Sequence, residues 1–331
     1  MNGNGSAEPR GRARGSFVTR PRWVVLVVAA LLALTALLAL TSPPGNRTVV
    51  AQKGSSTMPF GPKQVPPSDF GLPPFSGAYL NAGSLTKLNT MLPTAQQHGL
   101  KLLVKLAPAH DTMLDPTTGC FDLALWKQAI DRLSTFDFAP YVANGTVIGA
   151  ELVNEPHAND WCLDSPRRLT KAEVEEMAAY SKRIWPSLPV GAGRSDWVLA
   201  NAPWQQLDFA HSQYHMRKGD VEQWRLTTVS EAVAANVGLL LSLNYLAGQL
   251  DDSPMTAEQL QHFGTSLASD TYACMLTGYL YDTAYNARPG VMSAFTAIAR
   301  VAASHPAPPC YAKGGGVPQA PVAPTNFRLV P

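Results

Sequence analysis

One carboxylate stands where a catalytic acid would be expected. Glu155 belongs to the sequence Asn154-Glu155-Pro156, which directly follows the short apolar stretch 146–153. Such a stretch is typical of a strand buried on both faces, as strands of parallel sheets are, and the proline prevents further ladder pairing. A parallel α/β barrel presents catalytic side chains at the carboxyl ends of its strands. The sequence therefore predicts that Glu155 lies at such a strand end, where its carboxyl group can transfer a proton.

The stretch 149–156, GAELVNEP, resembles the fourth strand of the retaining glycoside hydrolases that are built on (β/α)8 barrels. Glu151 within it also matches some members of that group, and the preceding segment 98–107, HGLKLLVKLA, is similar to the helix end and third strand of the group. The resemblance implies that Glu155 is the general acid/base and that Asn154 hydrogen-bonds the sugar 2-hydroxyl.

The same resemblance places a nucleophilic carboxylate at the end of the seventh strand, where this sequence has Asn244. An amide cannot act as a carboxylate nucleophile, so three alternatives stay open. Asp282, after the last expected strand, is the first candidate for a second catalytic carboxylate, and Asp111 is the second. Either could act as a base on water, with inversion, at about 6.5–9.5 Å from Glu155. In the third alternative the barrel binds a saccharide without cleaving it.

Further polar and aromatic residues near the expected strand ends are candidates for binding the substrate. His215 matches the sixth strand of the family, where His or Tyr commonly lines the active site. Tyr214 and Gln213 would join it only if the strand register turns them inward. Aromatic faces suit the C–H faces of sugar rings. The expected substrate-binding residues are Asn154, His215, Tyr214, Asn244, His110, Trp161 and Tyr281.

Strand and helix patterns alternate along the chain about seven times, which predicts a parallel sheet with helical crossovers. The expected strands are 75–80, 100–107, 146–153, 189–192, 207–215, 238–244 and 273–280. Thr170 and Glu173 form a capping-box pattern at the start of a helix. A closed barrel needs one more strand, which we place within 57–70. We therefore predict an α/β fold of the (β/α)8, or TIM-barrel, type over residues 66–311.

The segments outside this domain have their own composition. Five arginines in residues 1–22 precede an unbroken apolar run, 23–40, which fits either a cleaved export signal or a retained membrane anchor. Residues 41–65 are rich in Pro, Gly and Ser, which is typical of a linker. Residues 312–331 are a second linker-like stretch, whose end resembles the opening of a fibronectin type III domain.

All four cysteines follow the apolar run, so an exported location would permit disulfides. Three pairings are possible. We favour Cys120–Cys162 and Cys274–Cys310, because each would join nearby loops of the barrel. No Cys-x-x-Cys spacing occurs, so a metal site is not expected.

Composition limits the function further. The chain has 331 residues, 46% of them hydrophobic, and a formal net charge of +2. That is ample for a large core and gives no reason to expect nucleic acid as a partner. No Gly-x-Gly-x-x-Gly opens a helix, and no cofactor is expected. We expect a monomer outside the cytoplasm, secreted or anchored through its N-terminal helix, that acts on a saccharide or glycoconjugate. It is either a hydrolase with Glu155 as its acid or an inactive saccharide-binding barrel.

Overall fold

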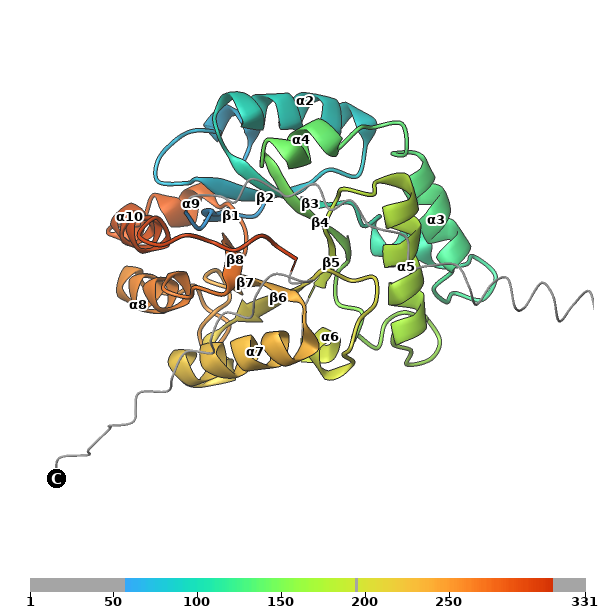
Figure 1. The fold of residues 1–331 in the computed structure, drawn as a ribbon. Helices are drawn as coiled ribbons and strands as arrows, with labels where there is room; N and C mark the ends of the chain where they lie inside the picture. Colours follow the sequence, from blue (N-terminus) through green and yellow to red (C-terminus); the bar gives the residue numbers. More distant parts are fainter. Residues whose placement is uncertain (1–56, 194–195, 312–331) are drawn as a thin grey trace, which may run out of the picture. The chain divides into compact units, whose positions relative to one another are not determined.

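A computed structural model of the protein describes residues 57–193 and 196–311. Eight parallel strands form a nearly closed barrel, with helices around it (Figure 1). The expected (β/α)8 fold is thereby confirmed. The strands are β1 (Phe60–Pro62), β2 (Gly77–Asn81), β3 (Lys101–Lys105), β4 (Val147–Val153), β5 (Val190–Gly193), β6 (Phe209–Tyr214), β7 (Gly238–Leu243) and β8 (Ala273–Gly278).

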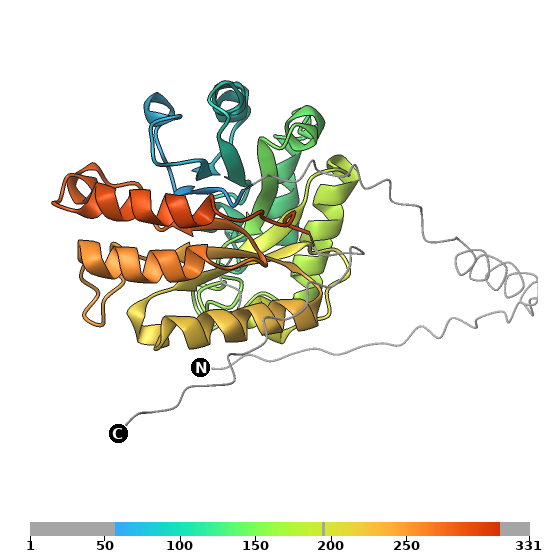
Figure 2. The same cartoon turned by 60° about the vertical axis from the view of Figure 1, so that its left-hand side comes forward.

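Helices and short 3-10 turns follow most strands. The longer helices are α2 (Leu85–Gln97), α3 (Leu123–Asp131), α5 (Lys171–Ile184), α7 (Val221–Ala235), α8 (Ala257–Ala268) and α10 (Val291–Ala302). The shorter ones are η1 (Pro67–Asp69), η2 (His110–Met113), α4 (Ala139–Ala143), α6 (Asp196–Ala200), η3 (Met216–Lys218) and α9 (Thr283–Asn286). Helices α7, α8 and α10 lie side by side along one flank of the barrel (Figure 2).

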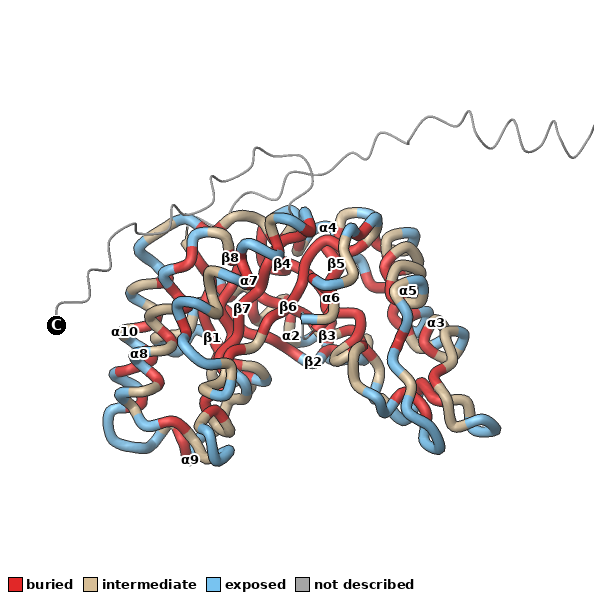
Figure 3. Tube along the Cα trace, turned by 90° about the horizontal axis from the view of Figure 1, so that it is seen from below, coloured by how far each residue is buried: buried red, intermediate tan, exposed pale blue. Residues whose placement is uncertain are grey.

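Burial explains why the strands read as apolar runs. All seven residues of β4 are buried, and so are all six of β7 and of β8. In Figure 3 the buried residues concentrate along the strands, while exposed residues lie on the outer helices and loops. The barrel interior holds one apolar cluster, and a larger one fills the space between strands and helices. Strands enclosed by both clusters need apolar side chains on both faces.

Local signals in the sequence match the observed ends of elements. The hydroxyl of Thr170 accepts a hydrogen bond from the Glu173 amide, and the Glu173 carboxylate accepts one from the Thr170 amide in return, which confirms the expected capping box.

The additional strand that a closed barrel needs is β1, which lies within 57–70 as expected. It also lies before residue 66, so the barrel begins earlier in the chain than the composition indicated.

The strands β1 and β2 form the weak seam of the barrel. Neighbouring strands elsewhere pair through ladders of three or more residues, whereas β1 and β2 meet through a single bridge, Lys63 with Tyr79. At one end of the seam the Ser76 amide donates to the Phe60 carbonyl at 2.9 Å. At the other end the Gln64 amide donates to the Tyr79 carbonyl at 2.7 Å.

Two disulfides join Cys120 to Cys162 and Cys274 to Cys310, the pairing favoured from the sequence. Such bonds persist in oxidising environments, so they indicate an extracellular location. The apolar run 23–40, the linker 41–56 and the tail 312–331 lie outside the described residues. Within 57–193 and 196–311, the helices all fall short of the length and apolarity that crossing a bilayer requires.

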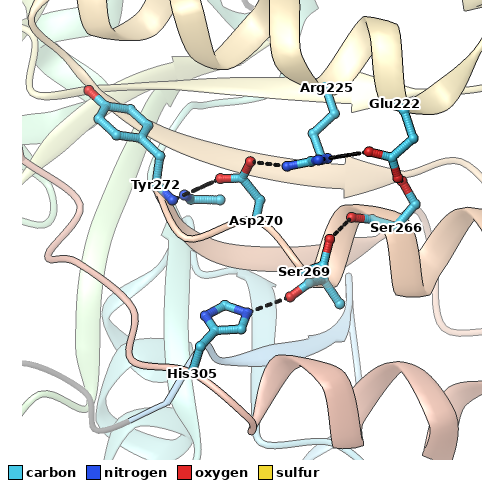
Figure 4. Close-up of polar contacts among 9 residues, drawn as sticks. Glu222, Arg225, Ser266, Ser269, Asp270, Tyr272 and His305 are labelled. Carbon is cyan, nitrogen blue, oxygen red and sulfur yellow. Dashed lines mark hydrogen bonds and ion pairs between the residues drawn. The ribbon is translucent and has the colours of Figure 1, made fainter. Parts of the chain in front are cut away.

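A charged network ties α7 to the start of β8 (Figure 4). Asp270 is 1% exposed and accepts hydrogen bonds from the amides of Tyr272 and Ala273, each at 2.9 Å. Its other oxygen accepts from Arg225 at 2.8 Å, and Arg225 also binds Glu222 at 2.7 Å. Because the carboxylate is buried, these bonds compensate for the hydration that it loses.

Replacing Asp270 by Asn is expected to lower the free energy of unfolding by about 2 kcal/mol, the scale of a hydrogen bond to a charged group. The amide keeps one acceptor for the backbone but places a neutral group beside Arg225. Urea denaturation measures the change. Asp164→Asn, at an exposed position, is the matched control, and an equal effect of both substitutions would show that the network contributes nothing specific.

Candidate active site

Glu155 follows β4 directly and takes an unusual backbone conformation. Its φ angle is +50°, in the left-handed region that residues other than glycine seldom adopt. The Glu155 carbonyl accepts hydrogen bonds from the Trp161 indole at 3.1 Å and from the Ala158 amide at 3.0 Å. These bonds hold the turn, and such strained positions cluster at functional sites.

The half-buried side chain of Glu155 lies between two cavities of about 120 Å³ each, and both are also lined by Asn154. The Asn154 amide donates to Glu155 Oε2 at 3.1 Å. The central cavity is over the barrel interior and is also lined by Tyr79, His211 and Ser242, from β2, β6 and β7. We call the second one the side cavity.

The side cavity brings two more predicted binding residues beside Asn154. His110 and Trp161 both line it, and their ring centroids are 4.6 Å apart. Asp160 also lines it, and its carboxylate lies 3.8 Å from His110 Nε2. Besides Glu155, the carboxylate of Asp160 lines this cavity. Asp160 was not among the residues expected from the sequence.

Beneath the central cavity lies a buried carboxylate, Glu151 on β4. It has no exposed surface, and its two oxygens are bound separately. Oε1 accepts from the Tyr79 hydroxyl at 2.5 Å, and Oε2 lies 2.8 Å from His211 Nδ1. These three residues from β2, β4 and β6 form what we call the interior triad.

The neighbours of Glu151 favour its ionised form. Burial alone would raise the pKa of Glu151, but the hydrogen bonds from His211 and Tyr79 and the charge of Lys105 hold it below its ordinary value of 4.5. Burial, with the adjacent Glu151 charge and hydrogen bond, raises the pKa of Tyr79 well above 10. The base of the central cavity therefore carries a carboxylate bonded to a neutral phenol at neutral pH.

Glycines on β5 make room for the interior triad. A Cβ atom on Gly193 would lie 3.0 Å from both Glu151 Oε2 and Asn154 Oδ1. One on Gly191 would lie 2.3 Å from the ring of Phe209, on β6. Because β5 contributes no side chain at these two positions, side chains of β4 and β6 can meet across it.

Acid unfolding should report the low pKa of Glu151. A carboxyl group whose pKa is lower in the folded state stabilises the protein above the unfolded-state pKa, and this contribution is lost as the pH falls through the folded-state pKa. We expect the wild type to lose more unfolding free energy below about pH 4.5 than Glu151→Gln does. Denaturation at pH 7 and at pH 3 measures the difference. Parallel losses in both proteins would contradict the assignment.

The other predicted site residues lie elsewhere. Asp282 caps α9, accepting the Tyr285 amide at 2.6 Å, and Asp111 is exposed in η2. Neither lines the central or the side cavity. Both therefore lie apart from the two cavities that adjoin Glu155.

Four predicted binding residues also stay outside both cavities. The Tyr214 hydroxyl donates to the Gly219 carbonyl at 2.6 Å, and its ring packs on Trp224 and Phe263, on the outside of the barrel. His215 precedes η3. Asn244 is buried, and its side-chain oxygen accepts the Ala247 amide at 3.0 Å. The Tyr281 hydroxyl donates to Asp69 at 2.6 Å.

His211, on the inward face of β6, was not among the residues expected from the sequence. Phe209, His211 and Gln213 share the inward face of β6, and His211 and Gln213 line the central cavity, whereas His215 comes after the strand ends and does not line it. The alternation of the segment was visible, but either face could have been the inner one. The large aromatic Phe209 was the available signal, since it shares a face with His211.

Among residues 57–193 and 196–311, His, Cys, Asp and Glu side chains form no group of three or more that could hold a metal ion. A larger cavity, about 500 Å³, lies between residues 64–67 and α2, and it shares no lining residue with the central or the side cavity.

The barrel is similar to known glycoside hydrolase structures. A GH5_18 protein from Bifidobacterium longum subsp. infantis aligns with a TM-score of 0.54 at 13% identity, covering 76% of this chain and 81% of its own. A GH10 endoxylanase from a sugarcane soil metagenome gives 0.52 at 11% identity, covering 77% and 99%. Xylanase 10B of Thermotoga maritima gives 0.50 at 11% identity, covering 77% and 97%. At these identities the likeness shows the fold alone.

No protein-family model matches the sequence, and a search of curated proteins finds no match either.

Proposed function

We propose that the protein is a carbohydrate-active hydrolase, located outside the cytoplasm, that cleaves O-glycosidic bonds with Glu155 as general acid/base. The observation that carries the proposal is the position of Glu155. Its carboxyl group stands at the carboxyl end of β4, beside Asn154, and borders both cavities. Catalytic residues of TIM-barrel enzymes occupy this face.

The chemistry of the proposed reaction fits the surroundings of Glu155. A glycosidic oxygen must gain a proton as it leaves, and a half-buried carboxylic acid can supply it. The Asn154 amide orients one Glu155 oxygen. The His110–Trp161 pair offers an aromatic wall for a sugar ring in the side cavity. The fold, which is shared with solved glycoside hydrolase structures, is compatible with this reaction class.

The alternative proposal is an inactive barrel that binds a saccharide at the cell surface. Three observations favour it. Asn244 stands at the end of β7 in place of a carboxylate, and Glu155 is the one carboxylate among the described residues that line the central cavity. Each cavity, at about 120 Å³, is also smaller than the roughly 300–1,000 Å³ of typical ligand pockets. Short saccharide ends or single groups of a sugar would fit best.

A panel of polysaccharides and aryl glycosides separates the two proposals. The hydrolase proposal expects release of reducing sugar or phenol by the wild type, and loss of that release in Glu155→Gln. Binding of the same saccharides, measured by calorimetry, without any release would favour the inactive barrel. Neither release nor binding would contradict both.

A further inference from the structure

Two buried polar atoms face the central cavity without a hydrogen-bond partner among the described residues. They are Nε2 of His211, on β6, and Oγ of Ser242, on β7. His211 is 8% exposed and Ser242 is 1% exposed. Buried polar atoms in folded proteins are nearly always hydrogen-bonded. Two such atoms in one small cavity therefore indicate a place for a small polar group.

The two residues lie on neighbouring strands and in adjacent layers of the barrel. In the parallel pairing of β6 with β7, Gln213 stands opposite Ser242, and His211 stands opposite Leu240. Ser242 is thus one layer nearer to the carboxyl ends of the strands than His211. A molecule bound to both would lie beneath the opening, in the same cavity as the carboxyl group of Glu155.

The tautomer of His211 follows from its bond to Glu151. A carboxylate only accepts hydrogen bonds, so the Nδ1 atom at 2.8 Å from Glu151 carries the proton. In the neutral imidazole, Nε2 then has a lone pair that points into the cavity. A buried carboxylate behind a histidine is the arrangement that orients a general base in serine hydrolases.

We propose that His211 binds the attacking water, assisted by Ser242, and acts as the general base of a direct displacement. This inference rests on the proposed function. His211 Nε2 removes a proton from the water as its oxygen forms a bond to the anomeric carbon. The bond from that carbon to the glycosidic oxygen breaks, and Glu155 gives its proton to the leaving oxygen. The step ends with imidazolium and carboxylate, and transfer of a proton back through solvent restores both.

With His211 as the base, the reaction does not need the second carboxylate that was expected at the position of Asn244. A single displacement by water needs a base and an acid but no covalent nucleophile. It therefore predicts that the released sugar has the inverted anomeric configuration.

Two substrates that differ only in the leaving group test the proposal on the full-length protein. They are phenyl and dinitrophenyl glycosides of the sugar that the wild type releases fastest in the panel. Dinitrophenolate leaves without a proton, so Glu155→Gln should keep turnover of that substrate and lose turnover of the phenyl glycoside. His211→Gln should lose at least about 100-fold on both substrates, since the base is needed in either case. Ser242→Ala should lose about 10-fold on both.

Proton NMR of the first product reads the anomeric configuration, and thermal unfolding checks that each variant folds. Inversion with loss in His211→Gln supports the proposal. If His211→Gln fails to fold, inversion together with the loss of turnover in Ser242→Ala supports the proposal. Retention of configuration, or turnover in folded His211→Gln within about threefold of the wild type, overturns this inference while the Glu155 proposal stands. No turnover of any glycoside by the wild type overturns both.

Discussion

Replacing Glu155 by Gln is expected to lower turnover of a phenyl glycoside by about 10³-fold, within the range of general acid catalysis. Gln has nearly the same shape and can still contact Asn154, but it has no proton to give to the leaving oxygen. Saccharide binding should stay close to that of the wild type. Steady-state kinetics and calorimetry on the same preparations measure the two effects separately.

Glu231→Gln is the matched control for that substitution, because Glu231 is exposed on α7, away from both cavities. It should leave turnover and binding unchanged. Equal turnover in Glu155→Gln and the wild type would show that the acid is another group. Asp160, which shares the side cavity with Glu155, would then be the next residue to replace.

Most of the fold could be predicted because its strands are buried on both faces. The stretch Val147–Val153 is apolar apart from Glu151, so it has no solvent-facing side, and the helices begin at recognisable caps such as Thr170. The strand β1 was harder to locate because it has three residues and no continuous ladder with β2. Its place depends on closing the barrel, which is a property of the whole chain.

Site residues could be predicted only where their place in the sequence determines where they lie in the barrel. Glu155 and Asn154 come immediately after a strand, so they had to lie at its carboxyl end. His211 and Tyr214 belong to one strand and point to opposite sides, and a shift of register by one residue would exchange them. Sequence alternation gives the two faces but not which one is inside. The partners of Glu151 come from β2 and β6, and no local pattern joins three strands.

Predicted residues outside the cavities have local structural roles. Asp282 and Asn244 accept backbone amides within three residues of themselves, which is the common use of Asp and Asn after an element ends. A polar residue at a strand end can therefore serve either as a cap of this kind or in catalysis. Only the spatial position of the cavities distinguishes the two roles.

Replacing Gly61 by Ala is expected to lower the free energy of unfolding by about 3 kcal/mol or more, through overpacking. A Cβ atom on Gly61 would lie 1.7 Å from the carbonyl oxygen of Gly77. That oxygen belongs to the backbone, so no side-chain rotation relieves the clash, and β1 would have to move from β2. Chemical denaturation measures the loss, and hydrogen exchange of the Gln64 amide reports the opening of the seam.

Gly83→Ala is the control, since its Cβ would meet nothing nearer than Asn81 Oδ1 at 3.9 Å. Equal stability of the two variants would show that the seam tolerates separation. The consequence for the site follows from the bridge between Lys63 and Tyr79, which spans this seam and lines the central cavity. Moving β1 would displace Lys63, which follows it directly and lines the central cavity. We therefore expect Gly61→Ala to lower turnover even at temperatures where the protein remains folded.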